Sequence, residues 1–125
     1  MLKATDAVAT LATRDMKASA AFYEGKLGFV PHSRMGDELV TYISGKSIFT
    51  VYLSPQTAGT NMATAVSWGV SDVDQTVAGL KARGILFEHY DMPGTKLEGD
   101  VHVNGDMRVA WFKDPDGNIL NLVKV

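Results

Sequence analysis

The three histidines are the side chains best suited to acid–base or metal chemistry, and their spacing bears on which role they can take. His32 and His89 stand 57 positions apart, and no His-x-His or Glu-x-x-His pair accompanies either of them. Glu88 is adjacent to His89, so on a strand these two side chains point to opposite faces. His102 flanks an Asn104-Gly105 turn signal, and we expect it to be exposed to solvent. The spacing favours solvated or locally hydrogen-bonded rings over a catalytic metal centre.

Other reactive groups are absent or isolated along the chain. There is no cysteine, which excludes thiol catalysis, iron–sulfur clusters and cysteine-type zinc sites. Neither Gly-x-x-x-x-Gly-Lys nor Gly-x-Gly-x-x-Gly occurs, nor does a Gly-x-Ser-x-Gly elbow. Aspartate, glutamate, histidine and Tyr52 remain available for metal-free catalysis, but no spacing fixes a pair within proton-transfer reach.

The composition predicts a single soluble domain. The 125 residues are 46% hydrophobic, which suffices for one core without a disulfide or structural metal. The net charge is −2, with 12 basic and 14 acidic residues scattered singly, so we expect no nucleic-acid partner. We see no signal-peptide pattern and no apolar run long enough for a membrane span, and we expect a cytoplasmic protein with no membrane partner.

The pattern of a strand followed by a helix occurs twice in the chain, and these elements must position the side chains described above. Asp15 and Asp72 each follow a half-apolar strand and precede apolar residues at helical spacing, as an N-cap residue does. Gly28 and Gly84 close the two predicted helices. The same offset of 57 relates His32 to His89, which could approach each other if the halves were related by a pseudo-twofold axis. We therefore predict two similar units, at about 1–57 and 58–125.

Three predicted strands follow each helix, so each unit is expected to be βαβββ. Two-residue glycine turns separate the strands of the first unit, and Asn104-Gly105 and Asp114-Pro-Asp-Gly117 mark turns in the second. The segment 55–62 connects the units, and the segment 91–100 is a long extra loop. The predicted strands span 29–35, 38–44, 47–54, 85–90, 107–113 and 118–124.

Strand alternation predicts which side chains face the helices. Leu120 and Leu122 share one face of the last strand, which we expect to lie under a helix. In the strand before the second helix, Trp68 belongs to the helix side and the small residues face away from it. The predicted fold class is α+β, with a curved eight-stranded mixed sheet whose uncovered concave face is suited to ligand binding.

Two motifs in this duplicated frame resemble a known family. The run Asp15-x-x-x-Ser19-x-x-Phe22-Tyr23-x-x-x-Leu27-Gly28-Phe29 and the run from Phe112 to Asn118 look like the vicinal oxygen chelate superfamily. That superfamily includes glyoxalase I, extradiol dioxygenases, fosfomycin-modifying enzymes and bleomycin resistance proteins. The resemblance covers essentially the whole chain and implies the glyoxalase/bleomycin resistance fold. By themselves, Asp114-Pro-Asp-Gly117 is typical of a structural turn and Tyr23 is typical of a core residue.

Metal-dependent members of this family carry ligands at four positions. Carried over residue by residue, these positions fall on Val8, Tyr52, Ala65 and Asn121, and none of these is histidine or glutamate. A divalent ion needs several imidazole or carboxylate donors about 2 Å away. We therefore expect neither a metal nor another cofactor.

Without a metal, the fold implies a cavity with small and aromatic walls. Tyr52 and Trp111 could stack on a flat ligand and Asn121 could orient it, and the predicted lining carries no formal charge. We predict that Trp111 faces the cavity opposite Tyr52 and contacts the ligand, whereas Trp68 does not; Trp111 could instead be a core or dimer-interface residue. The predicted ligand-binding residues are Val8, Thr10, Thr50, Tyr52, Ser54, Ala65, Ser67, Val109, Trp111 and Asn121, with Ile119 also facing inward.

These features favour a metal-independent, small-molecule-binding protein that resembles bleomycin resistance proteins and acts by sequestration or as an accessory binder. The alternative is a lyase, isomerase or dioxygenase of the same superfamily with a diverged active site. A purely structural interaction module is a third alternative, although Ala65 and Ser67 leave more room than such a module needs. We further expect a homodimer, because the sheet edges need pairing, and a gating role for the loop 91–100.

Overall fold

The computed structural model describes all 125 residues, and the first half of the chain forms a four-stranded sheet with one helical segment. The sheet has the order β1-β4-β3-β2, in which β1 is parallel to β4 and the other pairs are antiparallel. The helical segment starts as an α-helix and continues as a π-helix, where one regular helix was predicted. The elements are β1 (Ala9–Thr13), α1 (Met16–Ala20), the π-helical η1 (Ala21–Lys26), β2 (Val30–Met35), β3 (Leu39–Ser44) and β4 (Ser47–Leu53).

The second half repeats this plan with two additional short strands. Its order is β5-β10-β9-β8-β7, with β6 also paired to β9, and β5 is parallel to β10. The elements are β5 (Thr64–Val70), α2 (Val73–Ala82), β6 (Phe87–Glu88), β7 (Lys96–Glu98), β8 (Val101–Asn104), β9 (Met107–Lys113) and β10 (Ile119–Lys124).

The strand count and sheet continuity differ from the prediction. The structure has ten strands in two sheets, where one curved sheet of eight strands was predicted. The strand predicted over 85–90 is shortened to β6, and the predicted loop 91–100 contains β7, which pairs with β8 as a hairpin. The extra hairpin extends the edge of the second sheet beside β9, where the chain would otherwise leave unpaired backbone groups.

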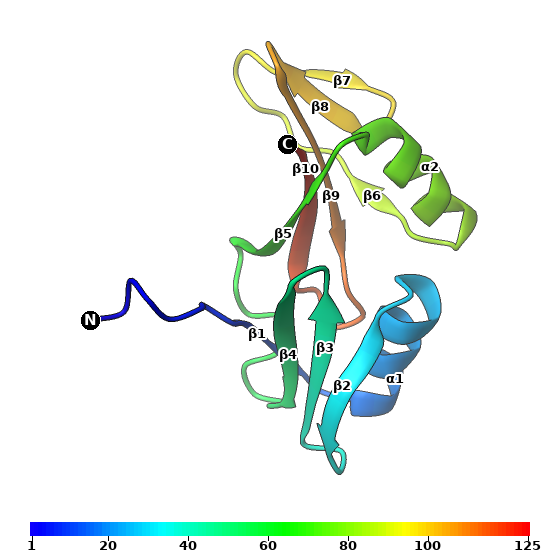
Figure 1. The fold of residues 1–125 in the computed structure, drawn as a ribbon. Coiled ribbons are helices and arrows are strands. Elements are labelled where there is room, and N and C mark those ends of the chain that lie inside the picture. Colours follow the sequence, from blue (N-terminus) through cyan, green and yellow to red (C-terminus); the bar gives the residue numbers. More distant parts are fainter.

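Both helices lie on the same side of the molecule, and the opposite faces of both sheets are left uncovered (Figure 1). No helix is long and apolar enough to span a bilayer.

The helix boundaries follow from the repeated sequence signals. The Asp15 carboxylate accepts hydrogen bonds from the backbone N–H groups of Lys17 and Ala18, and the Asp72 carboxylate accepts one from Gln75. After each helix the chain turns at a glycine with positive φ, 80° at Gly28 and 88° at Gly84.

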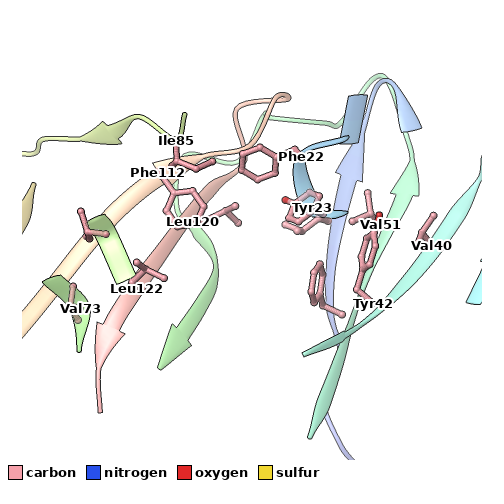
Figure 2. Close-up of a cluster of buried hydrophobic side chains, with 14 of the residues drawn as sticks. Phe22, Tyr23, Val40, Tyr42, Val51, Val73, Ile85, Phe112, Leu120 and Leu122 are labelled. Carbon is pink, nitrogen blue, oxygen red and sulfur yellow. The ribbon is translucent and has the colours of Figure 1, made fainter. Parts of the chain in front are cut away.

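The core lies between the helices and the two sheets and joins both halves. In Figure 2, Phe22 lies between the group around Phe112 and Leu120 and the group around Tyr23 and Val51. The Phe22 ring is 5.0 Å from the Tyr23 ring and 6.4 Å from the Phe112 ring. One contiguous apolar cluster therefore stabilises both βαβββ units.

Trp68 belongs to this core side, as strand alternation predicts. Its ring stacks between Phe29, at 5.5 Å, and Phe112, at 6.4 Å, and its Nε1 donates to the Ser44 hydroxyl. Leu120 and Leu122 are buried on the same side of β10.

A buried polar network attaches the turn 114–117 to the first half. The Tyr23 hydroxyl donates to the Asp114 carboxylate at 2.6 Å, and Thr13 donates to Asp116 at 2.6 Å. The Asn118 amide donates to the Ala12 carbonyl and to Asp114. This turn therefore joins two strands and also fixes one half of the protein against the other.

Candidate functional site

The candidate site residues of the first half lie on the uncovered face of its sheet or at its edge. Thr10 on β1 and Thr50 on β4 are cross-strand partners, and their hydroxyls are 3.2 Å apart. Tyr52 and Val8 are exposed. Ser54 lies beyond β4, and its hydroxyl is 2.5 Å from that of Thr57. These side chains form a small polar surface, flanked by apolar residues, rather than a closed cavity.

The remaining candidates lie on the second sheet. Asn121 on β10 is opposite Trp111 on β9 and Ser67 on β5, so these three side chains share the face away from α2. Val109, two residues before Trp111, lies on that face and is buried, and Ala65 is partly buried on β5.

The two groups do not form one cavity within this chain. Trp111 was predicted to lie opposite Tyr52, but its aromatic neighbours are Tyr90 and His102 of its own half. The pocket that contains Trp111 is lined only by residues from Met62 onwards, and Tyr52 is not among them.

Trp111 is the centre of an aromatic cluster on the second sheet. Its ring is 4.8 Å from the His102 ring and 5.4 Å from the Tyr90 ring, and both contacts are edge-to-face. The indole Nε1 donates to the Thr64 hydroxyl at 3.0 Å. Trp111 itself is half-buried, so part of its ring remains available to a ligand.

His102 is fully buried, which contradicts the expectation that it is exposed. The two-residue turn after Asn104 pairs His102 with Val109 across the β8–β9 hairpin, and this register turns the imidazole onto the Trp111 face. Its Nε2 accepts a hydrogen bond from the backbone N–H of Tyr90 at 2.9 Å. The hairpin register was the sequence signal that could have identified His102, because its partner Val109 was already predicted to face inward.

A pocket of about 340 Å³ opens beside this cluster. Trp111 and Tyr90 form its aromatic walls, and Ile119 adds an apolar surface. Lys113 lies at the rim and forms an ion pair with Glu88 at 3.2 Å. The complete lining is Met62, Ala63, Thr64, Tyr90, Trp111, Lys113 and Ile119.

The largest hollow has a different character. It measures about 550 Å³ and is lined by Arg14, Lys17 and Arg34 among other residues. Arg34 is bound by both carboxylate oxygens of Glu24, and Arg14 donates to the backbone carbonyls of Asp116 and Ala58. Both arginines therefore have structural roles, and the pocket beside Trp111 is the better candidate for a ligand-binding site.

The contacts of His89 are with its own half of the chain, whereas His32 lies on β2 of the first sheet. His89 lies 2.7 Å from the Asp100 carboxylate, which also binds Lys81 at 2.7 Å, and its ring is 6.4 Å from that of His102. The hydrogen bonds from Lys81 and His89 lower the pKa of Asp100 below its ordinary value. This cluster fixes the start of β8 against α2.

The donor set does not fit a metal ion. The four positions that the resemblance assigns to ligands hold Val8, Ala65, Tyr52 and Asn121, and the first two of these side chains have no lone pair. No three histidine, aspartate, glutamate or cysteine side chains converge anywhere in the structure. A resident divalent cation would lack the imidazole and carboxylate ligands that such ions require.

Solved structures with the same fold include binding proteins and an enzyme. A bleomycin-binding protein in complex with bleomycin has 22% identity and a TM-score of 0.73, over 97% of this chain and 98% of that one. A bleomycin-binding protein of Streptomyces verticillus in complex with copper(II)-bleomycin has 22% identity and a TM-score of 0.71, over 98% and 97%. Lactoylglutathione lyase from Agrobacterium tumefaciens has 17% identity and a TM-score of 0.71, over 97% and 93%.

The family comparison covers nearly the whole chain. No curated protein sequence matches it closely. Residues 6–122 match the model of one family, and the solved structures above share its fold. The chain therefore belongs to the Glyoxalase/Bleomycin resistance protein/Dioxygenase superfamily.

Proposed function

We propose that this protein binds a planar small molecule beside Trp111, without a metal ion, and acts by sequestering it. The observation that carries this proposal is the pocket of about 340 Å³, whose walls include Tyr90 and a half-buried Trp111. Aromatic walls favour flat ligands, and a stacking contact contributes on the order of 1 kcal/mol beyond area burial. The similarity in fold to bleomycin-binding proteins supports the same class of function.

The absence of a suitable donor set supports metal independence. Val8 and Ala65 occupy two of the four positions where metal-dependent relatives would carry ligands. The test is elemental analysis of protein purified without chelators. We expect no stoichiometric manganese, iron, nickel or zinc, and a stoichiometric content of any of them would overturn this part of the proposal.

A lyase, isomerase or dioxygenase with a diverged active site is the second candidate. The observation in its favour is the His89–Asp100 pair, in which a carboxylate orients an imidazole as it does in many general bases. The imidazole of His89 is half exposed, the Asp100 carboxylate is largely buried, and neither residue lines the pocket beside Trp111. Turnover of a small-molecule substrate that His89→Gln abolishes would favour this candidate over a binding protein.

Tryptophan fluorescence with bleomycin as the probe tests the leading proposal. We expect bleomycin to quench the wild-type protein and Trp111→Phe to lose most of this quenching. Titration calorimetry should show that Trp111→Phe binds about fivefold more weakly, which corresponds to about 1 kcal/mol of stacking. Trp68→Phe is the matched control, because Trp68 lies in the core between Phe29 and Phe112. If Trp68→Phe abolished the quenching and Trp111→Phe did not, the assignment of the binding face would be wrong.

We further propose that a second copy of the chain completes the site. The uncovered face of the first sheet exposes Val30, Ile43, Ile48 and Tyr52, an apolar surface that no element of this chain covers. In a twofold dimer, this face of one copy could close over the Trp111 face of the other and bring Tyr52 and Trp111 to one cavity.

We place the protein in the cytoplasm, where a chain without cysteine needs no oxidative folding.

A further inference from the structure

Unpaired polar atoms gather around Trp111. Four buried side-chain oxygen or nitrogen atoms have no hydrogen-bond partner in the chain, and three of them are Tyr90 Oη, His102 Nδ1 and Asn121 Oδ1. His102 and Tyr90 contact the Trp111 ring, and Asn121 is its cross-strand partner. Buried polar atoms without partners cost folding free energy, so three of them around one ring call for an explanation beyond the stability of the fold.

The hydrogen-bonding character of these atoms follows from their neighbours. His102 Nε2 accepts from the Tyr90 backbone N–H, so in the neutral imidazole the proton lies on Nδ1, which becomes an unused donor. Asn121 Oδ1 is an unused acceptor, and the Tyr90 hydroxyl can serve as either. The cluster therefore offers a donor on one side of Trp111 and an acceptor on the other.

The strand geometry separates donor and acceptor by the width of a ring system. His102 is on β8 and Asn121 is on β10, the two strands that flank β9 and its Trp111. His102 pairs with Val109 and Asn121 pairs with Trp111, two residues further along β9, so the two residues lie diagonally across that strand. Their backbones are separated by about 9.5 Å across the strands and by about 7 Å along them. One flat ligand could accept from His102 at one edge and donate to Asn121 at the opposite edge.

We propose that His102 and Asn121 are specificity-determining residues that select a planar heteroaromatic ligand with a carbonyl at one edge and an N–H at the other. This inference rests on the proposed binding function and names the chemistry of its ligand. Because the atoms are buried, the ligand reaches them by displacing the Trp111 indole from its hydrogen bond to Thr64 and then stacks on it. The bound ligand supplies the hydrogen-bond partners that His102 Nδ1 and Asn121 Oδ1 lack in the free protein.

Three probes separate the two hydrogen bonds. 4(1H)-Quinolone is a flat bicycle that carries a carbonyl and an N–H on opposite sides of one ring. Its N-methyl derivative lacks the donor, and naphthalene lacks both groups. We expect the wild-type protein to bind 4-quinolone at least tenfold more tightly than naphthalene and at least fivefold more tightly than N-methylquinolone. Asn121→Leu should abolish the preference over N-methylquinolone, and His102→Phe should abolish the preference of N-methylquinolone over naphthalene.

A matched pair of asparagines distinguishes a binding role from a structural one. Asn118 and Asn121 are buried to the same extent, each with 6% of its surface exposed, but Asn118 uses its amide in bonds to Ala12, Asp114 and Gly59. We expect Asn121→Leu to raise the Tm, because it removes an unpaired buried oxygen, and Asn118→Leu to lower it. A fall in Tm for both variants would make Asn121 a structural residue and overturn the proposal.

A measurement on the wild-type protein covers the case in which His102→Phe does not fold. Nitrogen-15 NMR should show His102 protonated on Nδ1, and addition of 4-quinolone should shift that nitrogen. If 4-quinolone and naphthalene bind equally well, the hydrogen-bond assignment fails and aromatic binding survives. If none of the three probes nor bleomycin binds, the proposed function fails with it.

Discussion

At the scale of single residues, Tyr23 shows how a core aromatic ring holds a buried carboxylate. Its ring is fully buried among Phe22, Tyr42 and Phe49, and its hydroxyl donates to Asp114. Burial, followed by the charge of Asp114, raises the pKa of Tyr23 well above its ordinary value. The hydroxyl therefore remains a neutral donor to the carboxylate.

We expect Tyr23→Phe to lower the free energy of unfolding by about 1 to 3 kcal/mol, because the charged, largely buried Asp114 loses a donor. Urea denaturation measures the change. Tyr52→Phe is the control, since Tyr52 is exposed and its hydroxyl has no partner, and it should change stability by less than about 0.5 kcal/mol. Equal effects of the two variants would show that the Tyr23–Asp114 bond does not contribute to stability.

The same carboxylate makes stability depend on pH. Burial raises the pKa of Asp114 above its ordinary value of 3.8, although hydrogen bonds from Tyr23 and Asn118 act in the opposite direction. The folded state thus holds this proton more tightly than the unfolded state, so the contribution of Asp114 is full below pH 3.8 and is lost as pH rises through the folded pKa. The stability of the wild type relative to Asp114→Asn should fall as the pH rises above 3.8. Denaturant titrations of both proteins at a series of pH values measure this difference, and a rise in relative stability with pH would contradict the direction of the shift.

At the scale of elements, two glycines have opposite roles. Gly79 lies in α2 with open space where a Cβ would be, so Gly79→Ala should stabilise the protein by up to about 1 kcal/mol through helix propensity. Gly59 lies in the connector between the halves, with φ of 70°, and a Cβ there would be 1.9 Å from the Asp116 carbonyl oxygen. Gly59→Ala should therefore destabilise the protein by more than about 2 kcal/mol. Thermal unfolding of both variants is the measurement, and tolerance of alanine at position 59 would show that the turn 114–117 can move away from the connector.

The segment 91–100 remains our predicted gate for the ligand, although the structure gives part of it a fixed role. β7 pairs with β8, and Asp100 binds His89 and Lys81, so we expect only the residues between Tyr90 and β7 to move. We expect hydrogen exchange in 91–95 to slow when bleomycin binds, while exchange in residues 55–60 of the connector, which do not line the pocket, does not change. Equal protection of both segments, or of neither, would count against a gate.

At the scale of the whole molecule, the uncovered face of the first sheet should be the dimer interface. Ile43 and Ile48 are cross-strand partners, and 43% and 40% of their surfaces are exposed. Light scattering should give twice the chain mass of 13.5 kDa for the wild type, and Ile48→Glu should shift the protein towards the monomer because a carboxylate would be buried. Leu86→Glu is the control, since Leu86 is exposed outside this face and lies in the hollow beside Lys26 and Glu88. A wild-type monomer at high concentration would refute the dimer.

The sequence by itself determined the features that depend on neighbouring residues. The caps at Asp15 and Asp72, the glycine turns after both helices and the core side of Trp68 follow from local hydrogen bonding and strand alternation. The two family motifs were sufficient to indicate the fold because they lie at opposite ends of a duplicated frame.

Only the tertiary structure decided what surrounds Trp111. His102 was expected in solvent because it stands near a turn, but the β8–β9 register and the added β7 strand bury it against Trp111. Tyr90 joins the same cluster because its backbone N–H, in the loop after β6, donates to the His102 imidazole on β8. The sequence predicts which face of a strand a residue takes, since that depends on alternation alone. It does not specify which distant side chains share that face, because this depends on the pairing and register of strands that the chain brings together from far apart.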